Sequence, residues 1–201
     1  MAMALALLTS SSGALAEERP VVGTVEAAVP RINAVYGDDR RSLATRSPVR
    51  FRDILTTGSG ARMEVRLADG SEVTLGENTE LLVDEFIYQP QEKQHRLGMR
   101  MLRGAFLFTS GRGASSPRQT QIRLPVAVLG VRGTTLWGGT LDECCEVFVF
   151  EGEVTVSTDR GSVTLTEGEG TKVIEGNPPT PPKIWGQAKI DRARALVTLE
   201  P

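Results

Sequence analysis

Histidine is almost absent from this chain of 201 residues, in which His95, within the polar run QPQEKQH, is the only one. Catalysis near neutral pH and metal binding both rely heavily on histidine. A single histidine excludes the double-histidine metal set of an all-β cupin, and the sequence shows no Ser–His–Asp motif and no phosphate-binding Gly-Lys-Ser/Thr loop. We therefore expect no catalytic residue, no metal and no cofactor, and we expect His95→Ala to leave activity intact.

Cysteine is also scarce, and the two cysteines are neighbours, Cys144 and Cys145. Adjacent Cα atoms lie about 3.8 Å apart, short of the usual disulfide window, and in a strand their side chains point to opposite faces. A metal site would need more ligands. We expect one buried and one exposed thiol, and in an oxidising compartment a disulfide-linked dimer through Cys144 or Cys145.

The chain has neither an excess of positive charge nor a long apolar run. Its 23 basic and 25 acidic residues give a net charge of -2, which argues against nucleic acid as a partner. No segment approaches the ~20 apolar residues of a transmembrane helix. Residues 1–16 carry no charge and end in Ala14-Leu15-Ala16, which is typical of a secretory signal peptide, although the usual basic start is missing. We expect export, to the periplasm or beyond, with the mature chain starting near Glu17.

What the chain does have is a series of short alternating segments separated by Gly, Pro, Asn or Asp. In Ala61–Leu67 apolar and charged residues alternate, which predicts a half-buried strand. The charged row of this strand consists of Arg62, Glu64 and Arg66, and it is the candidate partner surface. Asp69-Gly70 follows directly and predicts a hairpin or corner. Faint internal repetition favours stacked β units over an arbitrary barrel.

The segment Pro125–Trp137, PVAVLGVRGTTLW, is the centre of the sequence. Its Arg132-Gly133-Thr134 corner is open to two interpretations. The first is a ligand anchor, with a guanidinium for a carboxylate or phosphate. The second, which we favour, is structural: Gly133 supplies the backbone freedom of a tight corner and Thr134 bonds to nearby backbone.

The domain organisation follows from composition. Residues 17–176 are predicted to form one β domain after the signal peptide of residues 1–16. Residues 177–201 form a proline-rich connector, beginning at Pro178-Pro179, and a tail for which a short helix is one interpretation. Within the β domain, residues 32–48 are rich in Arg and Asp without a period and predict a surface loop.

Two stretches carry a family resemblance. PVAVLGVRGTTLW followed by CEVFVFEGEVTV, and ILTTGSGARMEVRLADGSEVTLGENTELLV upstream, together resemble the FecR-type periplasmic domain over roughly residues 21–175. The chain departs from that pattern at Arg52, where Gly is usual before Asp53, and at Leu124, where Thr is common. The resemblance implies an all-β, twisted, solenoid-like domain of stacked strands. The structural motif residues are Asp69, Gly70, Pro125, Arg132, Gly133, Thr134 and Gly152.

The function expected from these observations is an exported, non-catalytic binding domain of the bacterial cell envelope, with an envelope protein or a cell-wall glycan as partner. A second hypothesis is a periplasmic signal-relay component of a sigma-factor or iron-uptake system. It would need a separate membrane anchor, because the sigma-binding segment, transmembrane helix and receptor-docking domain of the family's iron-uptake regulators are not recognisable here. The third is an envelope glycan hydrolase with a carboxylate pair assembled through space.

Overall fold

The computed structural model describes residues 19–89, 94–111, 119–142 and 144–199. Within these residues a sheet of 16 strands and one helix, α1 (Gln187–Ala195), make up the regular structure. The predicted all-β fold and the short helix in the tail are both confirmed. The expected signal peptide, residues 1–16, lies outside the described residues.

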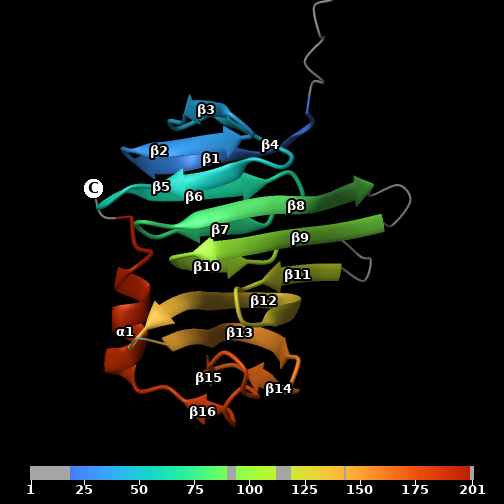
Figure 1. The fold of residues 1–201 in the computed structure, drawn as a ribbon, viewed down its shortest axis with the longest axis vertical. Coiled ribbons are helices and arrows are strands. Elements are labelled where there is room, and N and C mark those ends of the chain that lie inside the picture. The colour runs from blue at the N-terminus through green and yellow to red at the C-terminus, as the bar shows by residue number, and fades with distance from the viewer. Residues whose placement is uncertain (1–18, 90–93, 112–118, 143, 200–201) are drawn as a thin grey trace, which may run out of the picture.

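The sheet curls over on itself into two arms, whose strands are stacked along the long axis of the molecule (Figure 1). In spatial order, the first arm consists of β3 (Asp39–Ser42), β2 (Ile32–Tyr36), β5 (Ile54–Thr57), β8 (Glu80–Gln89), β9 (Gln94–Arg103) and β11 (Gln119–Arg123). The second arm consists of β4 (Pro48–Arg50), β1 (Val21–Val29), β6 (Arg62–Leu67), β7 (Glu72–Leu75) and β10 (Ala105–Thr109).

Two long strands join the arms. The first half of β12 (Val128–Leu141) pairs with β11, and its second half pairs with β10, so this one strand belongs to both arms. β13 (Cys144–Thr158) runs antiparallel beside it along the whole length. β13 in turn carries β14 (Gly161–Thr166) in one arm and β15 (Glu169–Val173) in the other, with the short β16 (Lys183–Ile184) at the edge of β15.

The two arms enclose one continuous hydrophobic core. Phe106 and Phe108 of the second arm and Leu55 and Met99 of the first are fully buried in the same cluster. These residues occupy alternate positions of their strands, because successive side chains of a strand point to opposite faces. Burial of each large apolar side chain stabilises the fold by about 1.5–3 kcal/mol, so the core makes the two arms one cooperative unit.

The bend that turns one arm into the other lies at two facing glycines. Gly133 of β12 has φ 59° and Gly152 of β13 has φ 89°, both in the left-handed region that favours glycine. A Cβ on Gly152 would lie 2.5 Å from the carbonyl oxygen of Gly133, so the backbones touch there. Next to them, the Thr134 hydroxyl donates to the Glu153 carbonyl at 2.8 Å, and the Thr134 amide donates to the Ser110 hydroxyl at 3.1 Å.

The prediction of a surface loop for residues 32–48 is wrong. Ile32 and Ala34 are buried at alternate positions, and this segment forms β2 and β3, which pair as a hairpin through Tyr36 and Asp39. The charged residues of this hairpin are concentrated in the turn and in β3, and they obscured the short apolar alternation of β2.

Arg52, which stands where the FecR-type pattern usually has Gly, adopts a backbone conformation typical of glycine. Arg52 has φ 64°, the backbone conformation that favours the glycine usual in the FecR-type pattern. The next residue, Asp53, is fully buried, and its carboxylate receives Arg19 at 2.7 Å, Arg41 at 2.5 Å and the Arg50 amide at 2.9 Å. Through Asp53, this turn therefore links Arg19, at the start of the described chain, to Arg41 of β3.

The C-terminal segment packs on the second arm, along one side of the stack (Figure 1). Trp185 stacks on Phe148 with ring centroids 4.7 Å apart and lies 6.1 Å from the ring of Trp137. Ala193 and Val197 complete this second hydrophobic cluster. The segment after residue 177 is therefore part of the folded domain.

The bend generates the first prediction. Gly133→Ala introduces a residue with φ above zero, which costs about 1–2 kcal/mol, but its Cβ meets nothing within 4 Å. Gly152→Ala carries the same strain and also a clash with backbone, so we expect the larger loss of unfolding free energy, about 3 kcal/mol or more. Urea unfolding of the two variants checks this order, and equal losses would show that the backbone contact at the bend contributes nothing.

Candidate functional site

The Asp69-Gly70 turn lies where the sequence predicted it. It joins β6 to β7 in a hairpin with Val65 opposite Val73, and Gly70 has φ 79°. The Asp69 carboxylate is fully occupied: it accepts the amide and the hydroxyl of Ser71, both at 2.9 Å. One role of this carboxylate is therefore to close the turn.

The same carboxylate holds the single histidine. His95 Nε2 lies 2.5 Å from Asp69 Oδ2, and both side chains are almost fully buried. This brings a serine, a histidine and an aspartate together, but Ser71 donates to Asp69 and not to His95, so the order of a catalytic triad is absent. His95 therefore occupies a structural position that its polar sequence context did not reveal.

The Pro125 and Arg132 motif residues are spread along the start of β12. Pro125 lies in the turn before β12, where the Leu124 amide donates to the Ala127 carbonyl at 2.8 Å. Arg132 and Gly133 are exposed at the bend. The Thr134 hydroxyl is already bonded to the Glu153 and Arg132 carbonyls, which favours the structural interpretation of this corner over a ligand anchor.

The charged row of β6 faces outward from the second arm. Arg66 lies 2.6 Å from Glu72 and 3.3 Å from Glu26, and it is the most exposed member of the row. Partial burial raises the pKa of Glu64, and the charge of Glu72 raises it further. With Arg62 at the other end of the strand, the face combines two arginines with several carboxylates.

The two cysteines differ less than the sequence suggested. Both are half-buried and free, so the expected pair of one buried and one exposed thiol is wrong, and the structure gives no support to a disulfide-linked dimer. Cys145 packs against the main core, and burial, followed by the charge of Glu146, raises its pKa to about 11. Cys145 is therefore protonated near neutral pH and weakly nucleophilic.

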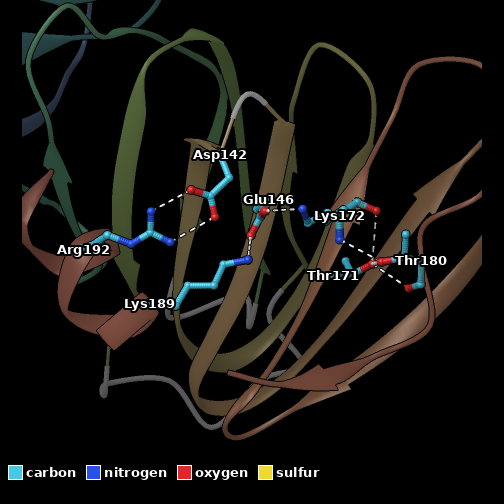
Figure 2. Close-up of polar contacts among 7 residues, drawn as sticks. All are labelled: Asp142, Glu146, Thr171, Lys172, Thr180, Lys189 and Arg192. Atoms are coloured by element: carbon cyan, nitrogen blue, oxygen red, sulfur yellow. Dashed lines mark hydrogen bonds and ion pairs between the residues drawn. The ribbon is translucent and has the colours of Figure 1, made fainter. Parts of the chain in front are cut away.

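A charged cluster fastens the C-terminal segment to β13 (Figure 2). Glu146 is fully buried, and its two oxygens lie between Lys189 of α1, in direct contact, and Lys172 of β15 at 3.6 Å. Beside it, Arg192 donates to both oxygens of Asp142, at 2.6 and 3.0 Å, and holds the pKa of Asp142 below its ordinary value. The role of Glu146 could not be predicted from the sequence, because nothing near it in the chain indicates a partner in the C-terminal tail.

Neither a membrane-spanning helix nor a metal-binding cluster is present among the described residues. No helix in this part of the chain combines the length and the apolar character needed to cross a membrane. Among the same residues, no group of three or more His, Cys, Asp or Glu side chains is placed to hold a metal ion.

The Glu146 cluster generates a stability prediction. Lys189→Met keeps the apolar stem near Trp185 but leaves Glu146 with only the more distant Lys172, and a buried charge that loses its partner costs about 3–5 kcal/mol. Since Lys172 remains, we expect a loss of about 2–4 kcal/mol in unfolding free energy. Lys183→Met is the matched control, because Lys183 has no ion pair within the described residues. Equal stability of the two variants would refute the fastening role.

The cysteine geometry generates a reactivity prediction. In a Cys144→Ser variant the remaining Cys145 should react with iodoacetamide at pH 8 ~100-fold more slowly when folded than when unfolded, because its pKa of about 11 lowers the thiolate population. The rate should rise steeply between pH 9 and pH 11. Rapid alkylation of the folded variant at pH 8 would contradict the raised pKa of Cys145 and its packing against the main core.

Comparison with known proteins places this geometry in a family. Residues 53–155 match the family model described as FecR protein. No curated protein matches the chain. Two crystal structures of a protein assigned as an anti-sigma factor from Parabacteroides distasonis ATCC 8503, at 2.50 and 1.65 Å resolution, are similar in fold, with TM-scores of 0.56 and 0.53.

Each likeness has 21% sequence identity and covers 69% of this chain and 62% of the other, so the chain spans about three-fifths of the length of these relatives. At this identity the likeness establishes the fold alone. The family match includes Asp53, the Asp69-Gly70 hairpin and the bend at Gly133 and Gly152. This chain belongs to the FecR protein family.

Proposed function

We propose that this chain is a non-catalytic binding module of the cell envelope that relays a signal in a sigma-factor system, working with a separately encoded membrane protein. The observation that carries the proposal is membership of the FecR family over residues 53–155. The fold likeness to a protein assigned as an anti-sigma factor supports the same role. The uncharged leader sequence supports export to the periplasm.

The face that we assign to the protein partner is the outward side of β6. Its row of Arg62, Glu64 and Arg66 lies on a strand fixed on both sides, by β1 and by β7. A rigid strand holds charged side chains at defined positions, and complementary charges on a partner then determine orientation and association rate. Surface ion pairs such as Arg66 with Glu72 contribute little to stability, so this row is available for recognition at small structural cost.

Charge reversal tests the proposal. In the assay, the purified chain is cross-linked to its partner in envelope extract and the amount of retained partner is measured. The triple variant Arg62→Glu, Glu64→Lys and Arg66→Glu should retain at least fivefold less partner than the wild type, because several ionic contacts change sign together. The matched control is Arg160→Glu, in the turn between β13 and β14, far along the stack from β6.

Far-UV circular dichroism and the melting temperature of the triple variant should stay close to wild type. Mass spectrometry identifies the retained protein, and a membrane-anchored regulator or receptor component is the expected result. Unchanged capture by a folded triple variant would exclude this face, and retention of no envelope protein by the wild type would contradict the relay function.

A further inference from the structure

A cleft in the described structure lies on the first arm and extends to the corner between β1 and β2. It has a volume of about 890 Å³ and opens around the ends of β2, β3, β5, β8 and β9. These strands follow one another through the upper half of the stack (Figure 1). Ala28, Pro30 and Leu43 provide apolar wall. A cleft of this size suits a ligand of several rings rather than a single small ion.

A ladder of polar side chains crosses the cleft from strand to strand. Cross-strand pairing places Ser42 opposite Asn33, Asn33 opposite Thr56, Thr56 opposite Glu80 and Glu80 opposite Arg103. All five line the cleft. Neighbouring strands lie about 4.8 Å apart, so the five side chains span roughly 19 Å. The ladder offers hydroxyl, amide, carboxylate and guanidinium groups in one line, which means donors and acceptors together.

The charge of the cleft is positive. Arg103 is paired with Glu80 at 2.6 Å, whereas Arg31 and Arg40 have no ion pair within the described residues. An unpaired arginine that lines a cleft can receive a carboxylate or a phosphate in bidentate geometry. The Thr56 hydroxyl is buried in the same wall and has no hydrogen-bond partner among the described residues.

Arg31 is held at this cleft in an unfavourable backbone conformation. Its φ is 79°, which costs a non-glycine residue about 1–2 kcal/mol. Its carbonyl accepts the Gly58 amide at 2.9 Å, so the corner between β1 and β2 needs this backbone geometry. Glycine would satisfy the corner without strain, so the backbone geometry itself does not require an arginine at this position.

We propose that this cleft binds an acidic oligosaccharide, with Arg31 and Arg40 on its carboxylates and the ladder on its hydroxyl groups. A single phosphate would leave most of the ladder unused. Nucleic acid would require aromatic side chains for base stacking, and the lining has none. An extended peptide adds to the free edge of a sheet, and β3 is the only edge strand of the described sheet at this cleft. The rest of the ladder lies on β2, β5, β8 and β9, which are paired on both sides.

Calorimetric titration tests the assignment. The probes are a tetrasaccharide of galacturonic acid, the neutral tetrasaccharide of N-acetylglucosamine, and inorganic phosphate. We expect saturable one-to-one binding of the acidic tetrasaccharide, with affinity at least about tenfold higher than for the other two probes.

Arg31→Gly is the decisive variant. It removes the guanidinium and relieves the strain, so we expect about tenfold weaker binding together with an unchanged or higher melting temperature. Arg40→Gln should also weaken binding, and Arg160→Gln, in the distant turn between β13 and β14, should not.

Three results would overturn the assignment: no saturable binding of the acidic tetrasaccharide, equal affinity for phosphate or for the neutral tetrasaccharide, or wild-type affinity in the Arg31→Gly variant. The inference goes beyond the proposed relay function and concerns a cleft whose lining does not include the β6 row. Failure of glycan binding with intact partner capture by β6 would therefore reject only this site.

Discussion

The close contact between the backbones of β12 and β13 at their common bend is the constraint on which the rest of the structure depends. Both strands turn at the same level, because Gly133 and Gly152 face each other with left-handed backbone conformations. The bend converts one sheet into two arms that face each other, and only that arrangement gives the apolar sides of the strands a common core. The Arg-Gly-Thr sequence at this point is thus explained by architecture.

Three buried carboxylates add a second kind of constraint. Asp53, Asp69 and Glu146 are each almost fully buried, and each is held by cationic or donor groups from elsewhere in the chain. A buried charge is very unfavourable unless it is paired and hydrogen-bonded. Each carboxylate therefore stabilises one docking arrangement relative to its alternatives. Asp53 holds the first described residues against β3, Asp69 holds the β6–β7 hairpin beside β9, and Glu146 holds the C-terminal tail on β13.

The two arms present different outer faces, and this separates the two proposed binding roles. The second arm carries the β6 row and is covered in its other part by α1 and Trp185. The first arm carries the polar ladder and a cleft with two unpaired arginines. A protein partner and an acidic glycan would therefore contact different residues of the same rigid unit. The core between them is continuous, so binding on one arm is supported by the packing of both.

The sequence by itself determined the local elements. The alternation in Arg62–Leu67, the turn at Asp69-Gly70 and the corner at Gly133 all follow from rules that act between close neighbours, and all appear in the structure. The same rules failed for residues 32–48, where the charged residues of the turn and of β3 obscured the buried alternation of β2.

Tertiary structure alone decided the long-range pairs. The pairing of His95 with Asp69, the burial of Glu146 under the C-terminal segment and the ladder across five strands join residues from distant parts of the chain. No periodicity or motif records such partners, because they meet only after the sheet has curled and the strands have taken their register. The free energy of burying a charge or filling a core depends on that assembled environment, and the local sequence does not contain it.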